Sequence, residues 1–136
     1  MFRKILLCLS VLSLVSFAGC KKDAEIGSVL KELDSFTTEL VQKIDSTQGS
    51  VEGIDAAQQL LDSKKNALMK KLGVVREARG FQVSDETKKT LTESFAKNMT
   101  SVASLQIKYV GRSVRDPGYK SKIEKLVNDY RQLLTG

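Results

Sequence analysis

The stretch 25–47 reads EIGSVLKELDSFTTELVQKIDST, and it decides the fold. This spacing of three or four positions between apolar residues matches the 3.6-residue turn of an α-helix and draws one apolar stripe along it. The stripe consists of Ile26, Val29, Leu30, Leu33, Phe36, Leu40, Val41 and Ile44. A stripe of this kind is stable only when it is buried, so the rest of the chain has to supply packing partners.

A second helix is predicted over residues 51–79, after a break at Gly49 and with Ser50 as its N-terminal cap. Its stripe has a seven-residue spacing at Ile54, Leu61, Leu68 and Val75, with Ala57, Leu72 and Ala78 in the neighbouring row. Lys64 interrupts this stripe, so its side chain is expected to extend along the apolar surface to reach water.

Two further helices follow a connector at residues 80–83. Ser84 with the acids Asp85 and Glu86 is a typical helix start, and Asp116 followed by Pro117 is another. The third stripe consists of Leu91, Phe95, Met99, Val102, Leu105 and Tyr109, and the fourth of Tyr119, Ile123, Leu126, Tyr130 and Leu133. No segment shows the alternation that is typical of strands.

The four helices have expected lengths of roughly 34, 43, 40 and 27 Å, which allows them to pack side by side. Short connectors favour antiparallel packing of successive helices. The sequence therefore predicts an all-α fold, an up-down bundle of four antiparallel helices in one domain over residues 25–136. A three-helix bundle with a loose terminal helix is the alternative.

The N-terminus has the pattern of an exported precursor. Arg3 and Lys4 precede an apolar run over residues 5–17, and the small pair Ala18 and Gly19 then precedes Cys20. A run of this length is shorter than the approximately 20 residues that a membrane-spanning helix needs. We therefore expect residues 1–19 to be a signal peptide that is removed.

The segment 17–20, FAGC, resembles the lipobox of bacterial lipoproteins, with Phe17 where Leu is usual. This resemblance implies that a diacylglyceryl group is attached to the Cys20 thiol and that the signal peptidase cuts before Cys20. Residues 20–24 would then form a lipidated tether to the membrane. Resemblance to enterobacterial lipoproteins implies that Lys21, in the second mature position, directs the protein to the outer membrane.

Few residues are available for catalysis. The chain has no histidine, and its two cysteines are Cys8, inside the leader, and Cys20. A processed and acylated chain would have no thiol nucleophile, no imidazole base and no zinc site of the Cys/His type. We therefore expect no enzymatic activity, no catalytic residues, no metal site and no cofactor.

Charge is distributed unevenly along the chain. Residues 23–62 contain nine acids and two bases, whereas residues 63–136 contain sixteen bases and seven acids. One interpretation is a surface for anionic lipid headgroups or lipopolysaccharide phosphates. The candidate residues for that surface are Lys64, Lys65, Lys70, Lys71, Arg76, Arg79, Arg112 and Arg115. The alternative is that acidic and basic helices neutralise one another or carry ordinary solvated charge.

These observations favour a membrane-anchored, non-enzymatic interaction or structural module of the cell envelope. Its partners would be the membrane, through the lipid on Cys20, and another envelope protein or the cell wall. Nucleic acid is not expected, because an exported chain does not meet it and no aromatic-basic motif is present. An interaction module predicts an exposed apolar or basic patch. The alternative, a carrier or chaperone-like protein for a hydrophobic ligand, predicts an apolar cavity between helices.

Overall fold

The computed structural model describes residues 22–78 and 80–136, except for the side chain of Phe81. Its elements are α1 (Asp23–Asp45), α2 (Val51–Glu77), the 3-10 turn η1 (Gly80–Gln82), α3 (Asp85–Lys108), α4 (Val110–Arg115) and α5 (Pro117–Thr135). These described residues contain helices and turns but no strand, which confirms the all-α prediction. The predicted signal peptide, Cys20 and Arg79 lie outside the described residues.

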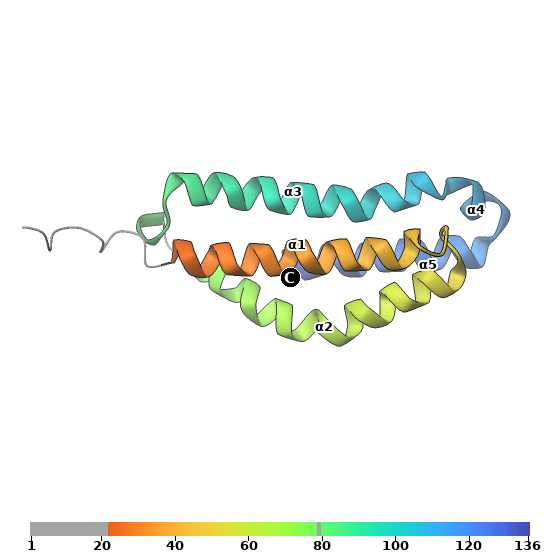
Figure 1. Ribbon diagram of the computed structural model, residues 1–136, viewed down its shortest axis with the longest axis horizontal. Coiled ribbons are helices and arrows are strands. Elements are labelled where there is room, and N and C mark those ends of the chain that lie inside the picture. The colour runs from red at the N-terminus through yellow and green to blue at the C-terminus, as the bar shows by residue number, and fades with distance from the viewer. Residues whose placement is uncertain (1–21, 79) are drawn as a thin grey trace, which may run out of the picture.

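The four long helices form a bundle in which their directions alternate along the chain (Figure 1). α1 packs against α2 and α3, and α5 packs against the same two helices. α1 and α5 therefore occupy opposite corners of the bundle, as do α2 and α3. The C-terminal helix α5 is firmly part of the core, with seven buried residues, so the three-helix alternative is wrong.

The order of the helices around the bundle differs from the expected one. Short connectors were expected to make successive helices neighbours, and this holds for α1 and α2 but not for α2 and α3, which make no extended contact. The connector between Glu77 and Asp85 crosses the end of the bundle through η1 (Figure 1). Seven residues can span up to about 23 Å, enough to bridge opposite corners. Two neighbouring pairs, α1 with α3 and α2 with α5, consequently run parallel.

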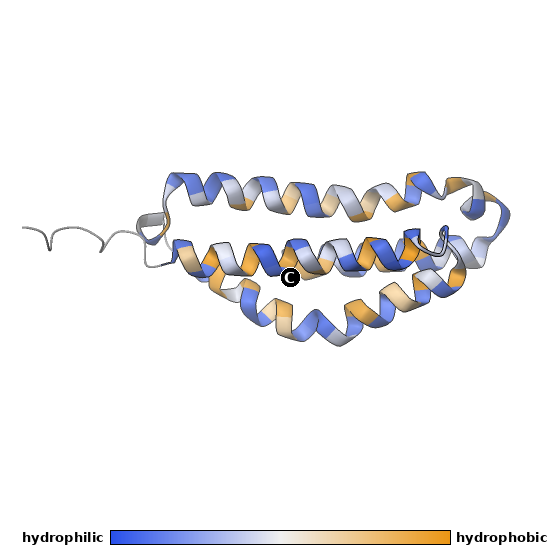
Figure 2. Ribbon diagram, viewed as in Figure 1, coloured by the Kyte–Doolittle hydropathy of each residue, from blue (hydrophilic) through white to orange (hydrophobic). Residues whose placement is uncertain are grey.

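The core is built mainly from the predicted stripes of α1, α2 and α5, and α3 adds Val102 and Leu105 (Figure 2). In α1 only Val41 of the predicted stripe is half-buried. In the second stripe the half-buried residues are Val75 and Ala78, and Ala78 lies just after the end of α2. Lys64, which interrupts the stripe of α2, was expected to reach water. It is exposed and forms an ion pair with Glu39 on α1.

α3 departs from its predicted stripe in its first half. Leu91, Phe95 and Met99 are only half-buried, while Ser94 and Asn98 are buried in their place. The reason is Asp34 on α1. Its Oδ1 accepts hydrogen bonds from Ser94 Oγ at 3.0 Å and from Asn98 Nδ2 at 2.5 Å. These bonds turn the polar side chains of α3 toward α1, and they satisfy groups that would otherwise be costly to bury.

Two buried tyrosines of α5 have opposite hydrogen-bonding situations. The Tyr130 hydroxyl lies 2.5 Å from Thr37 Oγ1, which itself donates to the Leu33 carbonyl, so Tyr130 donates to Thr37. Its ring stacks on Phe36 at a centroid distance of 6.3 Å. The Tyr119 hydroxyl, by contrast, has no hydrogen-bond partner in the described part of the chain.

We therefore expect opposite results from removing the two hydroxyls. Tyr130→Phe should lower the free energy of unfolding by about 1 kcal/mol, because it removes a buried bond while the ring still stacks. Tyr119→Phe should leave it unchanged or raise it by up to about 1 kcal/mol, because it removes a polar group without a partner. Urea unfolding at pH 7 measures both variants, and an equal loss of stability in the two would contradict this interpretation.

The same comparison of wild type and Tyr130→Phe at alkaline pH tests the burial of the Tyr130 hydroxyl. Burial raises the pKa of Tyr130 to about 12. The pKa of an unfolded tyrosine is about 10, so the stability that neutral Tyr130 contributes is complete below pH 10 and is lost as pH rises toward 12. The stability advantage of the wild type over Tyr130→Phe should therefore shrink and then reverse in unfolding curves recorded from pH 8 to pH 12.

Candidate interaction surface

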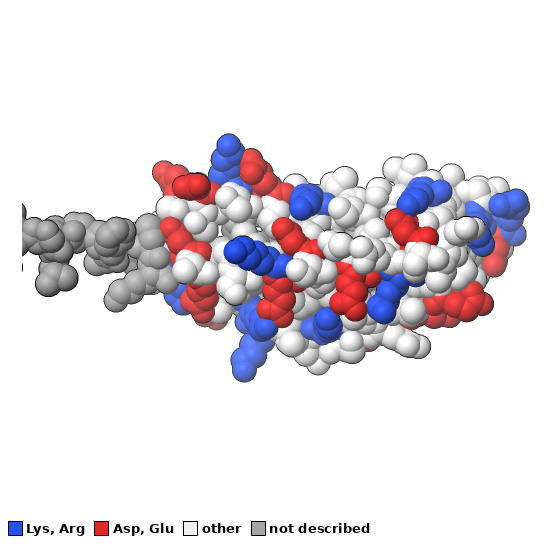
Figure 3. All heavy atoms as spheres, in the orientation of Figure 1, with Lys and Arg blue, Asp and Glu red and all other residues white. Residues whose placement is uncertain are grey.

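The fold separates the basic residues that the sequence grouped as one candidate surface. Lys64, Lys65, Lys70, Lys71 and Arg76 lie in the second half of α2. Arg112 and Arg115 lie on α4, at the end of the bundle where α2 begins (Figure 1). Basic and acidic side chains are interspersed over the face of the molecule seen in Figure 3. The described residues therefore form two separate basic regions.

Two bases of α2 are paired with acids of α1. Lys71 Nζ lies 2.6 Å from Glu32 Oε2, and Lys64 Nζ lies 3.3 Å from Glu39 Oε2. Arg76 instead donates to the Leu133 carbonyl at 3.2 Å. These pairs are about half exposed, so each contributes little to stability, but they reduce the positive charge that α2 presents. The acidic helix α1 and the basic part of α2 thus partly neutralise each other.

A different surface is left over at the α4 end. Three large aliphatic side chains are exposed there, Ile107 by 77%, Val110 by 54% and Val114 by 78%. The side chains of Arg112 and Arg115 are exposed in the same segment, and no ion pair joins either of them to the described residues. We call these five residues the α4 surface. It combines apolar area with positive charge that the described part of the chain does not neutralise.

The orientation of α4 is set by a break at Tyr109, the last residue of the stripe predicted for the third helix. Tyr109 leaves the helical conformation with φ −109° and ψ 21°. Its hydroxyl donates to Asp45 Oδ1 at 2.7 Å, and Lys108 Nζ reaches Asp45 Oδ2 at 2.8 Å. The ring lies so close to Gly49 that a Cβ there would overlap it. We call Asp45, Gly49, Lys108 and Tyr109 the Asp45 clamp.

The charges of the Asp45 clamp support one another. Burial opposes the charge of Asp45, but hydrogen bonds from Lys108 and Tyr109 outweigh it and lower the pKa of that carboxyl. The bond to Asp45 raises the pKa of Lys108, and burial followed by the same acceptor raises the pKa of Tyr109. The stabilisation that charged Asp45 contributes is therefore present above about pH 4 and is lost on acidification. The stabilisation that charged Lys108 and neutral Tyr109 contribute is present below about pH 10 and is lost in alkali.

The far end of α4 is fixed by the turn into α5. Asp116 Oδ1 accepts from the backbone N–H of Gly118 at 2.8 Å and of Tyr119 at 3.1 Å, and Pro117 is the first residue of the helix. This confirms the cap that the sequence predicted. Asp116 is also the acid nearest to Arg115 in the chain. Its carboxylate accepts hydrogen bonds from the backbone of α5 and forms no ion pair with that arginine.

Sequence reasoning missed the aliphatic part of the α4 surface. Ile107, Val110 and Val114 follow one another at spacings of three and four, but out of phase with the buried pair Val102 and Leu105. This change of phase is the sequence feature that could have revealed the exposed aliphatic residues. Apolar residues on the solvent side of an otherwise amphipathic helix are candidates for a contact surface.

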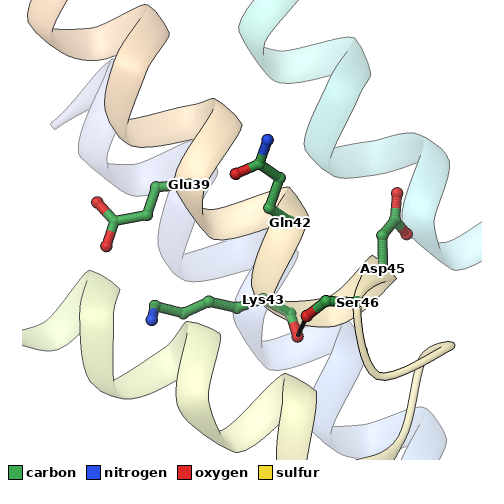
Figure 4. A pocket seen from close by; sticks show the side chains of 5 residues that line it. All are labelled: Glu39, Gln42, Lys43, Asp45 and Ser46. Atoms are coloured by element: carbon green, nitrogen blue, oxygen red, sulfur yellow. Dashed lines mark hydrogen bonds between the residues drawn. The ribbon is translucent and has the colours of Figure 1, made fainter.

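A shallow depression of about 520 Å³ lies along the last turns of α1 (Figure 4). It is lined by Glu39, Gln42, Lys43 and Asp45 of α1 and by Ser46, which follows this helix. It lies on the outside of the bundle and is largely open to water. It is therefore not the apolar cavity between helices that a carrier of hydrophobic ligands requires.

Two further features concern residues 22–78 and 80–136, the part of the chain that the structure describes. Within them, no three His, Cys, Asp or Glu side chains are grouped so that they could bind a metal ion. No helix among them has the length and apolar character needed to cross a membrane. Comparison with known proteins found no matching family model, no matching curated protein and no matching solved structure.

Proposed function

We propose that the protein is a lipid-anchored lipoprotein of the outer membrane that acts as a non-enzymatic interaction module. The observation that carries this proposal is the α4 surface. The predicted stripes of α1, α2 and α5 are almost entirely buried, yet Ile107, Val110 and Val114, within eight positions of one another in the chain, remain exposed, as do the two arginines of the same segment. Apolar area that a fold leaves exposed in one place is typical of a binding surface.

The position of the α4 surface supports the same function. α1 begins at Asp23, three residues after Cys20, so a lipid on Cys20 would hold this end of the bundle at the membrane. α4 lies at the other end of the bundle (Figure 1). The 23 residues of α1 span about 34 Å, so the α4 surface would project away from the membrane toward material in the periplasm.

The anchoring half of the proposal is tested at Cys20. Wild-type protein should incorporate labelled palmitate and sediment with the envelope, because several acyl chains together hold a protein at a membrane almost permanently. Cys20→Ala should abolish the label and block cleavage after Gly19, whereas the exposed control Lys88→Ala should behave as the wild type. Unlabelled wild-type protein that is free in the periplasm would refute the anchor.

A further inference from the structure

We infer that the α4 surface is the docking surface for a protein partner that presents a short apolar strip flanked by carboxylates. This inference rests on the proposed function and specifies the chemistry of its partner. It follows from three features of the described residues: uncompensated arginines, exposed aliphatic side chains and a clamped backbone.

Charge identifies the complementary group. Around α4, the lysines are compensated: Lys108 pairs with Asp45, Lys120 with Glu124 at 3.8 Å and Lys122 with Asp55 at 2.5 Å. Arg112 and Arg115 have no such partner among the described residues, and Arg115 uses only its Nε, which donates to the Gly111 carbonyl at 2.9 Å. A guanidinium group has a planar set of donors that suits a carboxylate, and arginine is enriched where protein interfaces gain most of their energy.

The aliphatic residues favour a protein over a lipid surface. Helices that lie in a membrane interface are usually long and carry Trp, Phe or Leu on the apolar side. Here the apolar side consists of one isoleucine and two valines on about two helical turns. The nearest aromatic side chain, Tyr109, is turned inward and bound to Asp45. This is a small patch that fits a strip of similar size on another protein.

A second copy of the chain fits the α4 surface poorly. In a two-fold symmetric contact the same patch meets itself, so the arginines of the two copies would face each other. The α4 surface contains no acid that could compensate them. Asp116, which follows Arg115 in the chain, already accepts two backbone N–H bonds of α5, so the complementary carboxylates are assigned to a different protein.

The Asp45 clamp gives the surface a fixed shape. Because Tyr109 and Lys108 are both bound to Asp45, the start of α4 is tied to the end of α1. Asp116 fixes the other end of α4 by capping α5. A preformed surface loses less conformational entropy on binding, which favours specific docking by so small a patch.

The test is photo-crosslinking of the full, lipidated chain in the envelope of cells that export it. A benzophenone amino acid replaces Val114, and in the control it replaces Thr92, an exposed residue in the first half of α3. We expect a protein adduct from position 114 whose crosslinked peptide contains Asp or Glu beside apolar residues. Arg112→Glu combined with Arg115→Glu should lower its yield at least about tenfold.

A matched charge reversal, Lys88→Glu with Lys89→Glu, should leave the yield unchanged, because both lysines are exposed on α3 at the other end of the bundle. Replacing the crosslinked carboxylates of the partner with lysine should restore the yield for the arginine-reversed chain. Circular dichroism melting curves should be the same for all variants, which excludes unfolding as the cause of lost crosslinking.

The remaining outcomes separate the inference from the function on which it rests. An adduct to phospholipid, to lipopolysaccharide or to a second copy would overturn the docking inference, as would a yield that is insensitive to the arginine reversal. An adduct from position 92 alone would also overturn it, while leaving the interaction module in place. If neither position gives an adduct in correctly anchored protein, both the inference and the interaction module fail.

Discussion

Leu68→Asp should unfold the bundle. Leu68 is 2% exposed and packs in the common core of the four long helices. A carboxylate there would be buried with no cation to pair with, at a cost of several kcal/mol. The whole stability of a domain of this size is about 5–15 kcal/mol, so most or all of it would be lost. Loss of the cooperative thermal transition followed by circular dichroism is the expected result.

Two comparisons make the Leu68 result specific. Lys88→Ala should change stability by no more than about 0.5 kcal/mol, because Lys88 is exposed and its ion pair with Asp85 joins neighbouring turns of one helix. Phe95→Asp should be milder than Leu68→Asp, because Phe95 is only half-buried and its carboxylate could reach water. A Leu68→Asp protein that melts like the wild type would contradict the core described above.

The helices that the sequence predicted best are those whose structure depends on local pattern alone. The stripes of α1, α2 and α5 lie inside almost residue for residue. The caps at Ser50, Ser84 and Asp116 also accept the backbone N–H bonds expected of them. Periodicity and capping are properties of neighbouring residues, so one sequence is sufficient to reveal them.

α3 was predicted less well, because its orientation depends on a distant residue. Ser94 and Asn98 are buried only because Asp34, sixty or more positions earlier, accepts their hydrogen bonds. The order of helices around the bundle was missed for a similar reason. Connector length limits which corners α2 and α3 can occupy, but side-chain packing selects among them.

The candidate site shows the same limit. Charge counted along the chain grouped Arg112 and Arg115 with the bases of α2, whereas the fold places α4 at the other end of the bundle from the C-terminus of α2. Ion pairs such as Lys71 with Glu32 then alter the charge of α2 across a helix interface. Only the folded arrangement distinguishes compensated from uncompensated bases.

Gly49→Ala should lower the free energy of unfolding by about 2–4 kcal/mol and should also loosen α4. Gly49 has φ +70°, where an L-residue is strained, and its N–H closes α1 by donating to the Ile44 carbonyl at 2.8 Å. The added methyl would also displace the Tyr109 ring. That movement would break the bond to Asp45, so amide exchange in α4 should become faster as the melting temperature falls.

A double-mutant cycle separates the two causes of this loss. In a Tyr109→Ala background the ring is gone, so Gly49→Ala should cost only the strain of its positive φ, about 1–2 kcal/mol. Gly73→Ala is the matched control, because Gly73 lies inside α2 with open space where the methyl would be, and it should stabilise the protein by about 0.5–1 kcal/mol. If Gly49→Ala costs the same with and without the Tyr109 ring, the clamp does not connect the α1–α2 turn to α4. If the costs differ as expected, the turn after α1 that contains Gly49 also fixes the α4 surface. Gly49→Ala should then weaken crosslinking at Val114, although both arginines remain.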